Sequence, residues 1–124
     1  VCGEGTFDEI SICGKTRVSH LNVSNVRTFD MEPEAFGFQC ASVRDIRGGN
    51  AKENAQITRN VLAGEKGPKR DMVLLNAAGA YVASGIDQDF PQAIERARDV
   101  IDSGKAGEKL DALIAFGQRC ALRA

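Results

Sequence analysis

Aromatic residues and basic clusters are both scarce in this chain of 124 residues. It contains no Trp, one Tyr and six Phe, so it offers little material for stacking nucleic-acid bases. Its 16 Lys and Arg residues are scattered along the chain and are balanced by 17 Asp and Glu residues. Because neutralising a phosphate backbone requires a concentrated basic surface, the composition argues against nucleic acid as a partner.

The sequence also lacks a segment suited to a membrane. Its longest apolar stretch runs from Met72 to Ala83, is interrupted by Asn76 and is too short to span a bilayer. There is no signal peptide and no polybasic anchor, so we expect a cytoplasmic protein without a membrane partner. The chain begins at Val1, and its first three residues read as the end of a strand. We therefore expect that further residues precede them in the natural protein.

The cysteines lack the spacing of a metal or redox site. No two of them form a C-x-x-C pair, which is the usual signature of zinc ligation or of a redox-active dithiol. A chain of this size can bury about two-thirds of its unfolded surface and needs no disulfide or metal in order to fold. We expect buried free thiols in a reducing compartment at all four positions: Cys2, Cys13, Cys40 and Cys120.

Signals for strands come first along the chain. Residues 1–3 and 7–12 flank a glycine-spaced turn and predict a strand that leads into a loop. Residues 16–21 and 26–31 are rich in β-branched or apolar side chains and enclose a stretch with turn chemistry, which predicts an antiparallel hairpin. Alternation along its second strand predicts one face with Val26, Thr28 and Asp30, and an opposite face with Arg27, Phe29 and Met31.

Signals for helices follow. Pro33 predicts the end of the hairpin and a short helical turn over 32–37. Asn50 and Glu53 have the spacing of a capping box and predict a helix over 50–63. Residues 68–84 are apolar nearly all round, which is typical of a helix covered on several sides. Asp89 begins another helix, which Gly104 ends, and apolar residues over 106–114 predict a last amphipathic helix.

The order of these elements indicates the fold class. A few strands followed by three or four covering helices predict one portion of an α/β domain. No repeat, low-complexity segment or linker divides the chain, so we assign residues 1–124 to one portion of a single α/β domain. On its own, such a piece would leave sheet edges and apolar faces uncovered.

Asp8 and Glu9 are the most informative pair for chemistry. Mg²⁺ prefers hard oxygen ligands and is typically held by one or two carboxylates together with substrate phosphates. Neighbouring acids converge on one ion only where the backbone turns, and Gly3 and Gly5 make a turn plausible here. Considered by spacing alone, however, two adjacent acids are also typical of an ordinary solvated loop.

Other polar residues favour structural roles. His20 has no evident carboxylate or nucleophile partner, and Gly48-Gly49-Asn50 has the features of an N-cap rather than of an anion site. Asn76, within the apolar helix, requires a hydrogen-bond partner if it is buried, so we interpret it as an architectural contact.

Ordered landmarks along nearly the whole chain resemble those of one enzyme family. They are Val-Cys-Gly-Glu-Gly-Thr-Phe-Asp-Glu-Ile at the start, Pro33–Gly37, Arg47–Asn50, Glu53–Ala55, Val61–Gly64, Gly67–Asp71, Leu74–Ala78 and Ile101–Ala106. The series resembles the C-terminal portion of anthranilate phosphoribosyltransferase. Gly-Pro-Lys-Arg-Asp and Leu-Leu-Asn-Ala-Ala are its most distinctive segments.

The resemblance implies an activity and a fold. The implied fold is the C-terminal part of a phosphoribosyltransferase/nucleoside-phosphorylase-like α/β domain. Enzymes of the family transfer the 5-phosphoribosyl group from phosphoribosyl pyrophosphate (PRPP) to anthranilate in tryptophan biosynthesis. Asp8 and Glu9 match the family's Asp-Glu motif, which holds Mg²⁺ against the pyrophosphate. The resemblance assigns no catalytic or substrate-binding residue to this chain, and it implies a homodimer formed through an N-terminal helical domain that this chain lacks.

Departures from the family pattern qualify this expectation. Cys2 stands where histidine is usual, and Thr6-Phe7 replaces the usual Gly-Leu before the acids. The family's glycine-rich pyrophosphate loop and its Lys-His-Gly-Asn segment are absent here, so we expect the isolated chain to be inactive. Two alternatives remain: a nucleic-acid-binding protein of the same fold, which would require a basic stripe, and a structural or assembly module.

Overall fold

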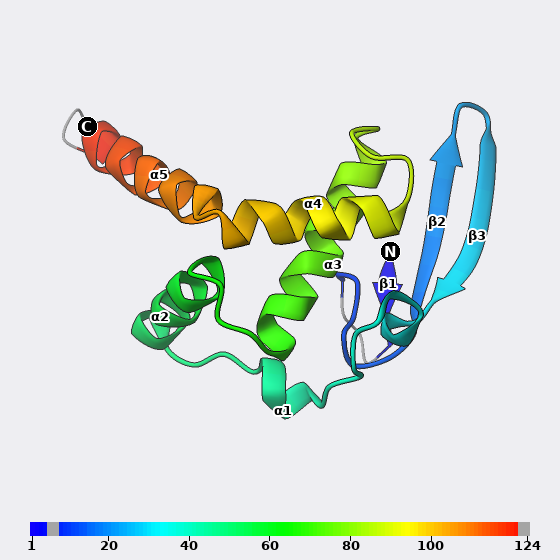
Figure 1. Ribbon diagram of the computed structural model, residues 1–124, viewed down its shortest axis with the longest axis horizontal. Helices are drawn as coiled ribbons and strands as arrows, with labels where there is room; N and C mark the ends of the chain where they lie inside the picture. The colour runs from blue at the N-terminus through cyan, green and yellow to red at the C-terminus, as the bar shows by residue number, and fades with distance from the viewer. Residues whose placement is uncertain (5–7, 122–124) are drawn as a thin grey trace.

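The computed structural model describes residues 1–4 and 8–121, and it shows a small sheet followed by a layer of helices (Figure 1). The strands are β1 (Cys2–Gly3), β2 (Thr16–Asn22) and β3 (Asn25–Met31), and they form an antiparallel sheet in the order β1-β2-β3. The helices are the 3-10 helix η1 (Pro33–Phe36) and the α-helices α1 (Val43–Ile46), α2 (Ala51–Leu62), α3 (Pro68–Ala83), α4 (Phe90–Asp102) and α5 (Lys105–Ala121).

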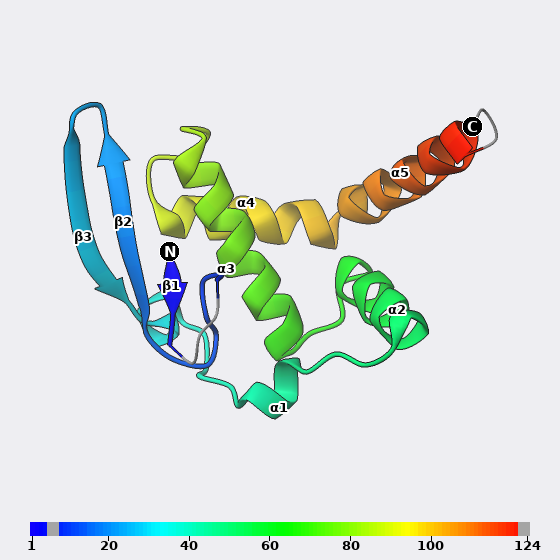
Figure 2. The same ribbon diagram turned by 180° about the vertical axis from the view of Figure 1, so that it is seen from behind.

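The hairpin prediction is confirmed, including its facing. Val26 pairs with Leu21 and Met31 pairs with Thr16, with Val23 and Ser24 at the turn. On β3, Met31 is buried and Phe29 is half-buried, whereas Val26, Thr28 and Asp30 are exposed. The face that carries Phe29 and Met31 therefore packs on the core, and the hairpin tip projects from the body (Figures 1 and 2).

Capping residues in the sequence place the starts of two helices correctly. Asn50 accepts hydrogen bonds from the amides of Lys52 and Glu53, and the Glu53 carboxylate accepts one from the Asn50 amide, which completes the capping box of α2. Asp89 accepts a hydrogen bond from the Gln92 amide at the start of α4. Because such caps satisfy otherwise unpaired amides, they fix where a helix begins.

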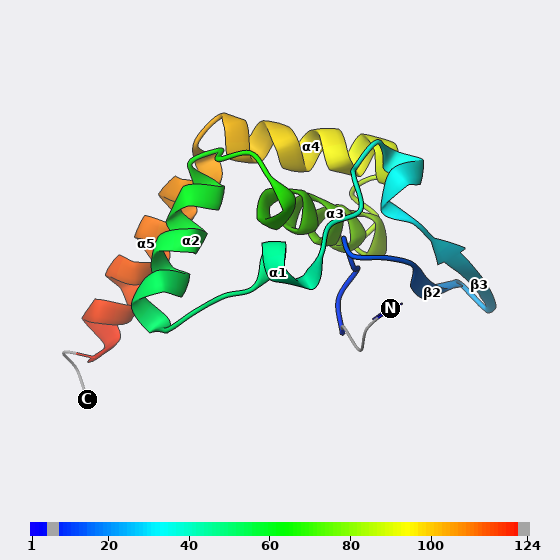
Figure 3. The ribbon, with the colours of Figure 1, turned by 90° about the horizontal axis from the view of Figure 1, so that it is seen from below.

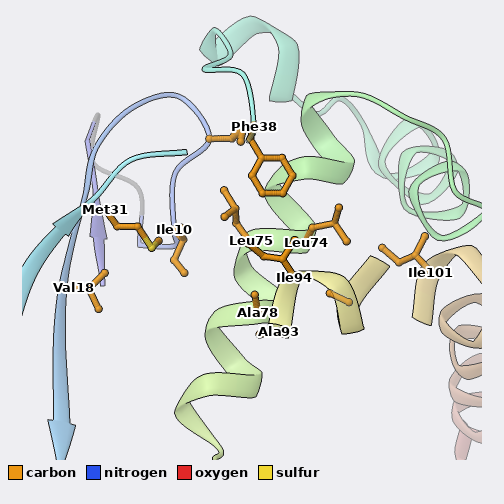
Figure 4. Close-up of a cluster of buried hydrophobic side chains, with 12 residues drawn as sticks. Ile10, Val18, Met31, Phe38, Leu74, Leu75, Ala78, Ala93, Ile94 and Ile101 are labelled. Atoms are coloured by element: carbon orange, nitrogen blue, oxygen red, sulfur yellow. The ribbon is translucent and has the colours of Figure 1, made fainter. Parts of the chain in front are cut away.

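Helix α3 is the centre of the packing. Leu74, Leu75 and Ala78 have no exposed surface and face α4 and the loop that follows β1 (Figure 4). The prediction of a helix covered on several sides is confirmed, because α3 contacts α1, α2, α4 and the loop that carries Ile10. Its exposed positions are Val73, which is 40% exposed, Ala80 and Ala83.

The structure adds one helix that was not expected and corrects one prediction. Helix α1 was not predicted, although Ser42 and Asp45 form a capping box there. The cysteines are free, as expected, but they are not buried: Cys13 is half-buried and the other three are exposed. Their positions explain this, since Cys2 lies in a short strand with one neighbour, Cys40 lies in a loop and Cys120 lies near the end of α5.

Helix α5 extends from the rest of the molecule and lies beside α2 (Figure 3). Leu113 and Phe116 on it are 64% and 57% exposed, so its amphipathic pattern is present but its apolar side has little cover. None of the described helices is long and apolar enough to cross a membrane.

Candidate functional site

The acidic pair lies in the loop between β1 and β2. Asp8 and Glu9 are exposed, whereas Ile10, Ser11 and Ile12 that follow are 3%, 1% and 0% exposed. The chain therefore turns abruptly from solvent into the core immediately after the two carboxylates. Phe7, which the sequence places in the same segment, lies outside the described residues.

Hydrogen bonds from three directions hold the buried part of this loop. The Asn76 side chain bonds both backbone groups of Ile10: its Oδ1 accepts from the Ile10 amide at 2.9 Å, and its Nδ2 donates to the Ile10 carbonyl at 2.8 Å. The Ser11 amide donates to Thr16 Oγ1 at 2.9 Å, and the Ala41 amide donates to the Ile12 carbonyl at 3.0 Å. The loop is thus fixed to α3, to β2 and to the segment before α1.

A cavity of about 450 Å³ opens beside Glu9. Glu9 and Asn76 both line it, and residues of α1, α2, α3 and the α1–α2 loop supply the remainder. Most of the lining is apolar, with Ile57, Val61 and Met72 prominent, while Lys69 adds a positive charge. Lys69 Nζ donates to the Asp45 carbonyl, so the lysine is tied to α1 as well.

The donor set suits a small divalent cation that is shared with a phosphorylated ligand. Within residues 1–4 and 8–121, neither Asp8 nor Glu9 forms an ion pair, so both carboxylates are available. Over the same residues, no three His, Cys, Asp or Glu side chains gather as a complete cage. Mg²⁺ needs no such cage, because it keeps several waters and takes further oxygens from phosphates.

The surroundings shift the pKa values of two titratable groups, Asp45 and Cys13. Hydrogen bonds from the Ser42 side chain and amide hold the pKa of the Asp45 carboxyl below its usual value. Burial, followed by the nearby Cys40 and Asp45, raises the pKa of the Cys13 thiol. Cys13 is therefore kept in its thiol form, which is the less reactive form of cysteine.

Two of the other polar candidates, the segment at Asn50 and Asn76, take structural roles. The Gly49 amide donates to Asn54 Oδ1 at 2.8 Å and the Asn50 amide donates to Glu53 Oε2 at 2.8 Å, so the N-cap interpretation of this segment is confirmed. His20 lies exposed on β2 opposite Arg27. The architectural interpretation of Asn76 is also confirmed, because its amide group joins α3 to the acidic loop.

Sequence reasoning missed which loop Asn76 holds, and it missed Gly79. A Cβ atom added at Gly79 would lie 2.8 Å from Ile10 Cδ1, so the absence of a side chain there admits Ile10. A polar residue in an apolar helix signals that a partner exists, but nothing in the local sequence identifies a partner 66 positions away.

Comparison with protein families places most of the chain in one of them. The model of the glycosyl transferase family, a/b domain, matches residues 1–107. The anthranilate phosphoribosyltransferase of Syntrophobacter fumaroxidans is 48% identical over 116 residues, which are 94% of this chain and 34% of that protein. The chain thus spans about one third of the length of the curated relatives it matches.

Two solved structures are similar in fold. The anthranilate phosphoribosyltransferase of Thermus thermophilus matches with a TM-score of 0.82 and 33% identity, over 98% of this chain and 34% of that one. The enzyme of Saccharomyces cerevisiae in complex with PRPP and Mg matches with a TM-score of 0.77 and 33% identity, over 89% of this chain and 32% of that one.

Proposed function

Because the chain belongs to the glycosyl transferase family with an a/b domain, we propose that it is the Mg²⁺-holding portion of an anthranilate phosphoribosyltransferase. Residues 1–124 would form the C-terminal part of the phosphoribosyl-transferring α/β domain, of the phosphoribosyltransferase/nucleoside-phosphorylase type. The observation that carries the proposal is the exposed Asp8-Glu9 pair on an anchored loop, in a chain 33% identical to a yeast enzyme solved with PRPP and Mg.

Asp8 and Glu9 would act by placing two hard oxygen ligands next to the pyrophosphate of PRPP. When bound, Mg²⁺ would offset the negative charge that grows on the pyrophosphate as its bond to ribose C1 breaks. Asn76 of α3 holds the backbone of Ile10 directly after the two carboxylates, which would limit the reorganisation needed when the ligand arrives. The ribose carbon is then taken by the amino nitrogen of anthranilate, and holding the two reactants close supplies much of the remaining acceleration.

The remaining parts of the activity would come from outside these 124 residues. By the family resemblance, the glycine-rich pyrophosphate loop, the residues that hold anthranilate and the helical domain that forms the homodimer would belong to the two thirds of the relatives' length that this chain does not match. The 124-residue chain assayed alone should therefore make no product. Product formed by it would contradict the proposal that activity requires residues outside this chain.

The proposal is tested on the full-length protein that contains this chain. Asp8→Asn and Glu9→Gln remove one charge each and keep the side-chain shape, so folding should be unchanged. Transfer should fall about 10²-fold or more, the usual cost of losing one stabiliser of a developing charge. The Mg²⁺ concentration that gives half-maximal rate should rise as well.

A matched control separates this effect from a general loss of negative charge. Asp99 is an exposed carboxylate on α4, and Asp99→Asn should leave both the rate and the Mg²⁺ dependence unchanged. If the Asp8 and Glu9 variants behaved like the Asp99 variant, the proposed metal site would be wrong.

A further inference from the structure

The loop that carries the acidic pair is held to helix α3 at one residue, Ile10. The two carboxylates themselves are exposed, and Ile10 beside them is 3% exposed. Asn76 on α3 bonds both the amide and the carbonyl of Ile10, at 2.9 and 2.8 Å. Its Nδ2 also donates to the Met72 carbonyl at 3.0 Å, which ties the side chain to its own helix.

A second residue of α3, Gly79, contacts the side chain of Ile10. Gly79 is three positions after Asn76 and so lies on the same side of the helix. A Cβ atom added at Gly79 would lie 2.8 Å from Ile10 Cδ1, which is too close. The next nearest atom, on the Phe90 ring, would be 4.0 Å away, which is an ordinary contact. Asn76 and Gly79 together form a clamp, in which one residue holds the backbone of Ile10 and the other admits its side chain.

The clamp acts next to the proposed ligands and not on them. Glu9 directly precedes Ile10, and both Glu9 and Asn76 lie on the wall of the 450 Å³ cavity. Loss of the clamp would loosen the loop at the residue next to the carboxylates, although Ser11 and Ile12 would still be bonded to Thr16 and Ala41. An incoming cation would then have to order Glu9 and Ile10 as it binds. Residues that orient metal ligands in this way affect metal affinity without touching the ion.

We propose that Asn76, with Gly79, is a positioning residue that sets the Mg²⁺ affinity of the Asp8-Glu9 pair. The inference rests on the proposed function, because it concerns the same metal site. It assigns to the Leu-Leu-Asn-Ala-Ala segment a task at the site, whereas the sequence alone suggested only an architectural contact.

The test measures Mg²⁺ binding directly, by calorimetric titration of the full-length protein in the presence of inorganic pyrophosphate. Asn76→Leu keeps the branched shape of the side chain and removes all three hydrogen bonds. It should weaken Mg²⁺ binding about 10- to 100-fold, the usual range for residues that orient metal ligands. Hydrogen exchange at the Ile10 amide should become faster, because its acceptor is gone.

A variant pair tests the other half of the clamp without changing Asn76. Gly79→Ala should weaken Mg²⁺ binding, by less than Asn76→Leu, because the new methyl group displaces only the end of the Ile10 side chain. Adding Ile10→Val removes Cδ1, the atom with which that methyl group collides, and should restore binding toward the parent value. Rescue by a smaller side chain would not follow if the glycine variant acted only on the helix.

Two controls distinguish the possible failures. Asp87→Asn breaks the ion pair of the buried Asp87 with Arg96 at 2.7 Å, so it should lower thermal stability and leave Mg²⁺ binding unchanged. If Asn76→Leu behaved like Asp87→Asn, the positioning role would be overturned while the proposed function stood. If Asp8→Asn and Glu9→Gln also bound Mg²⁺ like the parent, both proposals would fall together.

Discussion

At the scale of single residues, two aspartates illustrate how the surroundings set the cost of a charge. Asp71 lies half-buried in the first turn of α3, and burial raises the pKa of its carboxyl despite the nearby Arg70, Arg98 and Lys66. Asp30 lies on β3, where a hydrogen bond from Arg17 at 2.8 Å lowers the pKa of its carboxyl. One carboxylate therefore opposes folding when it is charged, and the other supports it.

These shifts predict opposite effects of pH on stability. Folding raises the pKa of Asp71 above 3.8, so its contribution to stability is present at low pH and is lost as pH rises through the folded value. Folding lowers the pKa of Asp30 below 3.8, so its contribution is present above that pH and is lost as pH falls through the folded value.

Thermal unfolding of full-length Asp71→Asn and Asp30→Asn variants between acid and neutral pH checks both signs. Relative to the parent, Asp71→Asn should gain stability as pH rises, and Asp30→Asn should lose it. The same slope in both variants would contradict the assigned environments.

At the scale of elements, short-range signals predicted where most helices and strands lie. The β2–β3 hairpin, α2 and α4 follow from alternation and from caps at Asn50 and Asp89, because these interactions act within a few residues. Helix α1 is only four residues long, and its Ser42-Asp45 box was not recognised. The exposed positions of α3 were not predictable, because an apolar sequence does not reveal which faces have a neighbour.

The packing of α3 on α4 predicts that a larger side chain destabilises the protein at a buried position of α3 but not at an exposed one. Ala78 has no exposed surface, whereas Ala80 on the same helix is exposed. Ala78→Leu should destabilise the full-length protein by about 1–3 kcal/mol through overpacking, and Ala80→Leu should change stability by about 0.5 kcal/mol or less. Chemical unfolding of the two variants measures this difference, and equal costs would contradict the packing described for α3.

At the scale of the whole molecule, the site could be predicted only in part. The resemblance proposes Asp8 and Glu9 as metal ligands, but it gives no sign that Asn76 holds the loop next to them, since Asn76 is 66 positions away from Ile10. The apolar sides of α3 and α5 also remain partly open, with Val73, Leu113 and Phe116 at 40%, 64% and 57% exposure. Such surfaces are typical of faces that another part of a protein covers, which agrees with a chain spanning about one third of its relatives' length.

The measurement that tests the central claim most directly is a crystal structure of the full-length protein with Mn²⁺ and inorganic pyrophosphate, since the anomalous signal of Mn²⁺ locates the ion. We predict a peak at bonding distance, about 2 Å, from carboxylate oxygens of Asp8 or Glu9 and from pyrophosphate oxygens. A pyrophosphate-bound ion held elsewhere, with both carboxylates facing away from it, would contradict the account.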